Sequence, residues 1–134
     1  MTNHFTTAEV LAIDKADDLK ISPLRTDGIS YGTPTWIWSV IVNGALYVRA
    51  YHGKKSSWYQ AAISQQSGRI IAAGESKNVS FESIEGEINT EIDYAYRNKY
   101  SSSPYLTAMI SEIAKASTIQ IIPENKHKDT TNEK

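Results

Sequence analysis

Residues 35–51 read TWIWSVIVNGALYVRAY, which is two runs of β-branched and aromatic residues separated by Asn43-Gly44. Such runs favour β-strands, and Asn-Gly tolerates the positive φ angles that a two-residue type I′ turn requires. The stretch therefore predicts an antiparallel hairpin whose strands cover 35–42 and 45–51. This hairpin decides how the rest of the chain is interpreted.

Pairing across the turn divides these residues between two faces. One face carries Trp36, Trp38 and Val40 opposite Tyr51, Arg49 and Tyr47, and the other carries Ile37, Ser39 and Ile41 opposite Ala50, Val48 and Leu46. The second set is small and aliphatic enough to fill the interior of a narrow barrel. The aromatic face should then point outward, where something is expected to cover it. Three covers remain open: the chain's own helices, a second subunit, or a flat ligand over part of the face.

Capping signals and periodicity predict the other elements. A first helix is expected from Thr6 or Thr7 to about Lys15, with Val10, Leu11 and Ile13 on one side. Two more are expected over 58–63, with an end near Gly68, and over 88–100. A last helix is expected after Ser103, with Pro104 at its first position and a buried stripe of Leu106, Met109, Ile110 and Ile113. Further strands are expected at 19–24, as a short edge strand, and at 69–73, 77–84 and 117–122. Six short strands with helices between pairs predict an α+β or mainly β protein with an antiparallel barrel or strongly curled sheet.

Composition indicates one domain of ordinary globular character. The 134 residues carry 14 Lys and Arg against 15 Asp and Glu, a net charge of −1, which disfavours a strongly basic nucleic-acid binder. Residues 1–123 are expected to form the domain, and residues 124–134, which contain no apolar side chain, are expected to be a disordered polar tail.

The same counts bear on location and on metals. The longest apolar run, 36–42, is too short to span a bilayer, residues 1–18 lack the basic start of a signal peptide, and there is no cysteine, so a cytoplasmic protein without membrane contact is expected. The three histidines, at 4, 52 and 127, are too widely separated to predict a metal site. His52 remains a candidate acid, base or ligand donor, or an exposed loop residue.

A basic loop follows the hairpin and leads into a predicted helix. Its candidate binding residues are Arg49, Lys54, Lys55, Ser56, Ser57 and Trp58. Free N–H groups at a helix start, serine hydroxyls and cationic side chains together predict a phosphate site. The alternative is that one serine merely caps the helix while the two lysines are solvated.

Several of these segments resemble the flavin-binding split barrels. The resemblance lies in residues 33–36, 46–50, 58–62 and 79–81, together with the basic loop. Residues 93–100, Asp-Tyr-Ala-Tyr-Arg-Asn-Lys-Tyr, and a terminal strand ending at Pro123 resemble a small bacterial family of unknown function within that superfamily. The resemblance implies a six-stranded antiparallel split barrel with flanking helices, assembled as a homodimer.

Relatives of this fold include the pyridoxamine-phosphate oxidases and the deazaflavin-dependent nitroreductases, in which a Trp-Tyr pair opens the helix as Trp58-Tyr59 does here. The resemblance implies FMN or a deazaflavin as the small-molecule ligand and an oxidoreductase of unknown substrate. Lys54, Lys55, Ser56 and Ser57 would then hold the phosphate, with Arg49 nearby and Trp58 beside the cofactor.

Two alternatives stay open. The first is a non-catalytic split-barrel dimer that has lost the cofactor, since the fuller Arg and Ser/Thr phosphate signature of the oxidases has no match here. The second is a single-strand nucleic-acid binder that uses the aromatic face as a stacking platform. The net charge of −1 and the lack of a wider basic stripe make nucleic acid the least favoured partner.

Overall fold

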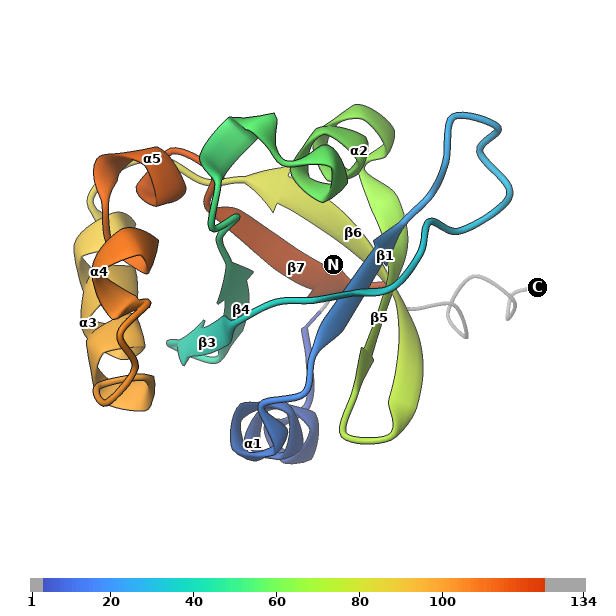
Figure 1. Ribbon diagram of the computed structural model, residues 1–134. Coiled ribbons are helices and arrows are strands. Elements are labelled where there is room, and N and C mark those ends of the chain that lie inside the picture. Colours follow the sequence, from blue (N-terminus) through green and yellow to red (C-terminus); the bar gives the residue numbers. More distant parts are fainter. Residues whose placement is uncertain (1–3, 125–134) are drawn as a thin grey trace.

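A computed structural model describes residues 4–124, in which a single antiparallel sheet curls into a half-barrel flanked by helices (Figure 1). The strands are β1 (Lys20–Pro23), β2 (Thr35–Trp36), β3 (Ser39–Val42), β4 (Ala45–Val48), β5 (Ser67–Ala72), β6 (Glu75–Ser83) and β7 (Ile119–Pro123). Their order across the sheet is β2-β1-β5-β6-β7-β4-β3. The two edge strands, β2 and β3, are neighbours in the sequence, so the curl of the sheet brings its two edges together.

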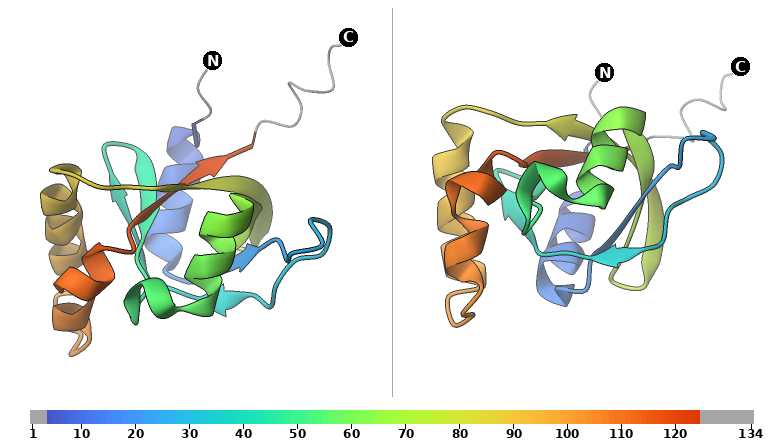
Figure 2. Two further views of the ribbon diagram at one scale, coloured as in Figure 1. Left: turned by 90° about the horizontal axis from the view of Figure 1, so that it is seen from above. Right: turned by 45° about the horizontal axis from the view of Figure 1, so that its top comes forward.

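The helices lie around this sheet (Figures 1 and 2). They are α1 (Thr7–Ala16), the 3₁₀ turn η1 (Gly53–Lys55), α2 (Ser57–Gln65), α3 (Ile88–Lys99), α4 (Leu106–Met109) and α5 (Glu112–Lys115). Helix α1 begins where predicted: Thr6 accepts a hydrogen bond from Glu9 N, and the Glu9 carboxylate accepts one from Thr6 N. No helix within residues 4–124 has both the length and the apolar character needed to cross a bilayer.

The predicted hairpin is confirmed between Ser39 and Val48. Asn43 and Gly44 have φ angles of 52° and 80°, as a type I′ turn requires. The ladder pairs Ser39 with Val48 and continues in the predicted register to the turn.

Beyond Ser39 the predicted pairing is wrong. Trp36 pairs with Lys20 of β1 instead of with Tyr51, and Trp38 lies in the link between β2 and β3, so it does not pair with Arg49. Ile37 N likewise donates to the carbonyl oxygen of Leu19, the residue just before β1, and not to the strand that follows the Asn43-Gly44 turn. The predicted strand 35–42 is therefore two strands, β2 and β3, and the described sheet has seven strands instead of six. Strand β1, predicted to be an edge strand, is not at the edge because β2 pairs with its free side.

The two predicted faces of the hairpin are confirmed as inner and outer faces. Leu46, Val48, Ala50 and Ile37 belong to the core inside the half-barrel, together with side chains of β1, β5 and β7. On the outer face, Val40 and Tyr47 are buried under Ile92, Tyr96 and Tyr100 of α3, with Trp38 packed against them. The chain's own helices thus cover this part of the aromatic face.

Several helices end or begin at other residues than the sequence predicts. Helix α2 ends with Gln66 at a φ of 58°, while Gly68 lies in β5, where a Cβ would be 2.6 Å from Pro23 Cα. The predicted last helix divides into α4 and α5, because Ser111 Oγ accepts from Ala114 N and starts a new helix. Ile113, predicted to be buried, is 66% exposed, and Leu11, predicted on the same side of its helix as Val10 and Ile13, is 57% exposed.

Glu124, the first residue of the predicted polar tail, contacts the sheet. Glu124 N donates to Asn78 O, and the Glu124 carboxylate accepts from Ser67 Oγ, so this residue is held against the sheet. Residues 125–134, the rest of the predicted tail, lie outside the described residues.

Candidate functional site

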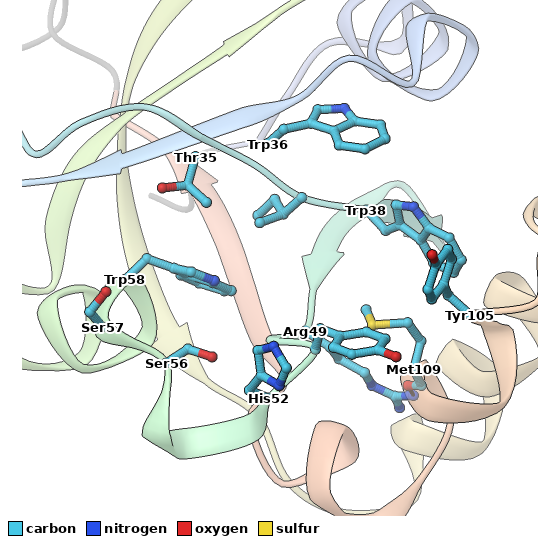
Figure 3. Close-up of a pocket in the computed structure, with 12 residues that line it drawn as sticks. Thr35, Trp36, Trp38, Arg49, His52, Ser56, Ser57, Trp58, Tyr105 and Met109 are labelled. Atoms are coloured by element: carbon cyan, nitrogen blue, oxygen red, sulfur yellow. Dashed lines mark hydrogen bonds between the residues drawn. The ribbon is translucent and has the colours of Figure 1, made fainter.

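A cavity of about 490 Å³ opens between the β2–β3 link, the end of β4, the start of α2 and helix α4 (Figure 3). Its lining consists of Thr35, Trp36, Ile37, Trp38, Arg49, Tyr51, His52, Ser56, Ser57, Trp58, Tyr105 and Met109. This volume falls in the range of about 300–1,000 Å³ that small-molecule sites occupy. Concavity and aromatic lining together make it the candidate ligand site.

Aromatic rings form most of the walls. Figure 3 shows Trp36 and Trp58 on two sides of the cavity and Trp38 with Tyr105 on another. Tyr51 makes edge-on contacts with His52 and with Tyr105, with ring centroids 4.9 Å and 6.0 Å apart. Large flat walls of this kind favour a flat, unsaturated ligand.

Trp38 packs against Tyr100, which does not line the cavity. Its ring stacks on Tyr100 with centroids 3.9 Å apart and planes 2° from parallel. The Tyr100 hydroxyl donates to Asp17 Oδ1 at 2.7 Å and accepts from Ser39 N at 3.2 Å. Burial, reinforced by the hydrogen bond to Asp17, raises the pKa of Tyr100 far above its usual range, so the phenol stays protonated and keeps this donor.

The start of α2 borders the cavity with unused polar groups. Ser56 is the N-cap by position, but its side chain makes no capping hydrogen bond. The first helical bond runs from Gln60 N to Ser56 O, so the N–H groups of Ser57, Trp58 and Tyr59 precede it and have no acceptor within the helix. Two serine hydroxyls and these N–H groups can donate to an anion at the cavity edge.

Arg49 lines the cavity, but its guanidinium group is turned to other partners. Nε donates to Thr118 Oγ1, Nη1 donates to Asp93 Oδ1 at 2.6 Å and to Met109 O, and Nη2 donates to both oxygens of Asn89. The side chain is 0% exposed. Its five N–H donors are therefore all satisfied within the protein.

The structure brings four of the six predicted site residues to the cavity: Arg49, Ser56, Ser57 and Trp58. Lys54 and Lys55 lie next to it in η1, with exposed side chains that are not part of the lining. His52, a loop candidate, lines the cavity as well.

Of the wall residues, the sequence predicts Met109 only as a buried helix residue, and it marks Tyr105 only as one of four tyrosines, at 94, 96, 100 and 105, of which one could donate a hydrogen bond to a bound ring. Met109 belongs to α4 and Tyr105 is its N-cap, about 50 positions after the basic loop. Only the folded arrangement brings this segment to the end of β4, where Met109 O accepts a hydrogen bond from Arg49. Among residues 4–124, no group of three or more His, Asp or Glu side chains is arranged to hold a metal ion.

Residues 9–121 match a family described as "Uncharacterized protein conserved in bacteria (DUF2255)". Because the match covers most of the sequence, this chain belongs to that family. No curated protein matches the sequence.

Two solved structures share the fold. A Listeria innocua protein described as a "Putative Pyridoxamine 5'-phosphate oxidase" has a TM-score of 0.60 and 15% identity, over 88% of this chain and 93% of that one. The conserved hypothetical protein Rv2991 from Mycobacterium tuberculosis has a TM-score of 0.61 and 12% identity, over 90% of this chain and 80% of that one. The predicted split-barrel fold is thus confirmed, and at these identities the likeness concerns the fold alone.

Proposed function

We propose that the chain is a flavin-binding protein whose cavity holds the ring system of FMN or of a deazaflavin. The observation that carries this proposal is the cavity of about 490 Å³ whose walls include three Trp side chains and whose edge is the start of α2. A ring ligand can stack against these walls while an attached phosphate receives hydrogen bonds at the helix start. The fold likeness to a protein described as a pyridoxamine 5'-phosphate oxidase supports the same ligand class.

Each predicted residue then has a place in the proposed site. The phosphate is bound by Ser56, Ser57 and the first N–H groups of α2. Lys54 and Lys55, in the adjacent turn η1, do not line the cavity but contribute positive charge near the phosphate. Trp58 packs against the ring. Arg49 positions Met109 and the cavity floor through its internal hydrogen bonds instead of binding the phosphate.

A bound flavin or deazaflavin would supply hydride transfer, which makes the protein an oxidoreductase. The chain's own residues need only bind the ring, orient it and exclude water from its covered face. His52, at the cavity edge and in contact with Tyr51, is the titratable side chain best placed to donate a hydrogen bond to a bound ring or substrate.

We also propose a homodimer. Trp36, Tyr51 and Tyr105 are 56%, 43% and 58% exposed although they are large aromatic side chains around one opening. A second copy packed over this opening would bury them and narrow the entrance to the cavity.

The test is direct binding. The purified protein is titrated with FMN, with riboflavin and with a deazaflavin while tryptophan fluorescence is followed, since Trp36, Trp38 and Trp58 all line the cavity. We expect saturable quenching and tighter binding of FMN than of riboflavin. The double variant K54A/K55A should weaken FMN binding about tenfold and leave riboflavin binding unchanged, because only FMN carries a phosphate.

The matched control is K15A/R97A, which also removes two positive charges, from exposed positions on α1 and α3. Its FMN affinity should equal that of the wild type. Equal affinity of the wild type for FMN and riboflavin would refute the phosphate assignment. Absence of binding to all three compounds would favour the second candidate, a non-catalytic split-barrel dimer, which the internal commitment of Arg49 supports.

A further inference from the structure

The wall of the cavity continues into the protein as a stack of two aromatic rings. Trp38 lines the cavity (Figure 3), and Tyr100 lies behind it with ring centroids 3.9 Å apart and planes 2° from parallel. Parallel contact at this distance overlaps the two π systems. Tryptophan and tyrosine are, besides cysteine, the side chains that lose a single electron most easily, and this chain has no cysteine. The stacked pair can therefore pass one electron from Tyr100 to Trp38.

The Tyr100 hydroxyl has a proton acceptor in place. A phenol that loses an electron becomes a strong acid, so its oxidation is easy only where a base takes the proton. Asp17 Oδ1 lies 2.7 Å from the Tyr100 hydroxyl, within the range of about 2.6–3.2 Å that proton transfer requires. Asp17 is the exposed C-cap of α1, whereas the Tyr100 side chain is buried. This hydrogen bond thus connects a buried ring to the surface.

Tyr96, the other tyrosine next to Trp38, lacks such an acceptor. Its ring centroid lies 6.5 Å from that of Trp38 and 6.0 Å from that of Tyr100, but its buried hydroxyl has no hydrogen-bond acceptor within residues 4–124. The guanidinium carbon of Arg49 lies 5.3 Å from the centre of the Tyr96 ring. A nearby cation and the lack of a base both disfavour loss of an electron. Of these two tyrosines, Tyr100 is the one equipped for oxidation.

The charges around Tyr100 also favour loss of an electron there. Lys99 Nζ lies 5.4 Å from the ring centre, but it lies 3.4 Å from Asp14 Oδ1, so this cation is paired. Asp17 adds a second carboxylate. Tyr100 and Asp17 are moreover the C-caps of α3 and α1, where the helix dipoles place negative partial charge. The surroundings of the stacked pair are therefore net negative and stabilise a positive charge on it.

We propose that Trp38, Tyr100 and Asp17 form a one-electron relay between the cavity and the end of α1. The relay is a property of the chain, whereas its oxidant, the light-excited ring of a flavin or deazaflavin, rests on the proposed function. Trp38 gives one electron to the excited ring and takes one from Tyr100, whose hydroxyl proton moves to Asp17 Oδ1. Tyr100 then recovers an electron from the ring and its proton from Asp17, so the cycle closes without a further reductant. The relay discharges the excited ring before it reacts with dioxygen or with the other walls.

The test uses the full chain without ligand and azide radicals made by pulse radiolysis, which oxidise tryptophan in preference to tyrosine. We expect the absorbance of a tryptophan radical to be replaced by that of a tyrosyl radical at a rate independent of protein concentration. Asp17→Asn should slow this transfer by about a hundredfold. Asparagine accepts the same hydrogen bond and tolerates the φ of 51° at this position, but it cannot take the proton.

Two further variants should abolish the fast transfer, and two matched controls should preserve it. Tyr100→Phe and Trp38→Phe remove the two members of the stack. Tyr96→Phe removes the neighbouring hydroxyl, and Trp58→Phe removes another tryptophan of the cavity, whose ring meets Tyr59 edge-on at 6.3 Å instead of stacking. A transfer rate that Asp17→Asn leaves unchanged, or a fast phase that persists in Tyr100→Phe, would overturn the relay.

A second measurement connects the relay to the proposed ligand. The chain loaded with FMN is given a light pulse, and we expect a transient tyrosyl radical that Tyr100→Phe loses. If FMN binds and no tyrosyl radical forms, the ring is not the oxidant and this inference is overturned while the proposed function stands. If no flavin or deazaflavin binds, the proposed function fails together with the assigned oxidant, and the azide experiment still decides whether the relay exists.

Discussion

The Arg49 side chain ties several elements together beneath the cavity. Its hydrogen bonds reach Asn89 and Asp93 on α3, Met109 on α4 and Thr118 at the start of the segment leading into β7. Lys115 of α5 adds a second cation, 3.0 Å from Asp93 Oδ2. A guanidinium group that is 0% exposed is tolerated only because every donor has an acceptor and a carboxylate balances its charge.

Removing that carboxylate should be costly. We expect Asp93→Ala to lower the free energy of unfolding by about 3–5 kcal/mol, because it leaves the buried Arg49 charge without its counter-ion. Urea unfolding followed by circular dichroism measures the change. Glu112→Ala is the control: this carboxylate is 3.9 Å from the same Lys115 but 93% exposed, and its loss should change stability very little. Similar effects of the two variants would contradict the assigned role of Asp93.

Ala73 is a second residue under local constraint. It has a φ of 52° in the two-residue turn between β5 and β6, where Gly74 follows with a φ of 79°. The Asn43-Gly44 turn has nearly the same angles but places an asparagine where this turn has an alanine. Alanine is strained at positive φ, whereas asparagine tolerates it.

Ala73→Asn should therefore stabilise the protein by about 0.5–1 kcal/mol. The measurement is the midpoint of chemical unfolding relative to the wild type. The same substitution at Ala12, an exposed residue in α1, should destabilise the protein because asparagine is a poorer helix former than alanine. A loss of stability in Ala73→Asn would show that the turn does not carry this strain.

At the scale of elements, α1 is attached to the β5–β6 hairpin by polar contacts. The Glu9 carboxylate lies 2.8 Å from Lys77 Nζ, and Asp18, two residues after the end of α1, accepts a hydrogen bond from Ala73 N. The hydrogen bond from Lys77 holds the pKa of Glu9 below its ordinary value of 4.5, and the same bond raises the pKa of Lys77 above its ordinary value. The ion pair thus stabilises the docked helix over a defined range of pH.

The lowered pKa of Glu9 and the raised pKa of Lys77 determine how the stabilisation by this ion pair changes with pH. A carboxyl group with a lowered pKa in the folded state contributes stability above its unfolded pKa, and this contribution disappears as the pH falls through the folded pKa. The lysine contribution is complete below its unfolded pKa and is lost only at high pH, as the pH rises through its folded pKa. At neutral pH both contributions are present.

We expect Glu9→Gln to cost less than about 1 kcal/mol at pH 7, because the pair is partly exposed. Glutamine can still accept from Thr6 N, so the cap of α1 is preserved. The difference from the wild type should shrink between pH 5 and pH 3, as measured by unfolding at several pH values. A difference that stays constant over this range would exclude Glu9 as the titrating group.

At the scale of the whole molecule, the curl of the sheet decides which surfaces meet. Strands β2 and β3 lie at opposite edges of the sheet yet are joined by only Ile37 and Trp38. This short link brings Trp36 and Trp38 to the opening that α2 and α4 complete (Figure 3). The exposed aromatic side chains at this opening are the basis of the proposed dimer.

If the chain forms the proposed dimer, substitution of the aromatic residues around the cavity opening should lower the mass of the assembly in solution. Trp36→Ala combined with Tyr105→Ala should convert a dimer to a monomer in sedimentation velocity experiments, since it removes apolar surface from the proposed interface. Tyr94→Ala is the matched control, because Tyr94 is 60% exposed but belongs to α3 and not to the cavity lining. A wild-type chain that sediments as a monomer would refute the proposed dimer.

Short-range patterns in the sequence specify the local elements and the class of fold. Asn43-Gly44 specifies a type I′ turn through backbone sterics alone, and the alternation from Ser39 to Val48 specifies which side chains face the core. The helix start at Thr7 follows from the same kind of short-range chemistry, the capping box of Thr6 and Glu9. The resemblance carried by short segments was enough to predict the split barrel.

The end of that hairpin and the surroundings of the cavity depend on contacts between segments far apart in the sequence. Trp36 pairs with Lys20, and Ile37 N donates to Leu19 O, with partners that lie more than 15 positions earlier in the chain and that no local pattern encodes. Arg49 is hydrogen-bonded to Asp93 and Asn89, 44 and 40 positions away, and Met109 of α4 and its N-cap Tyr105 line the cavity. Contacts over such separations depend on how the curled sheet and its helices pack, so the floor and far wall of the site follow from the assembled fold.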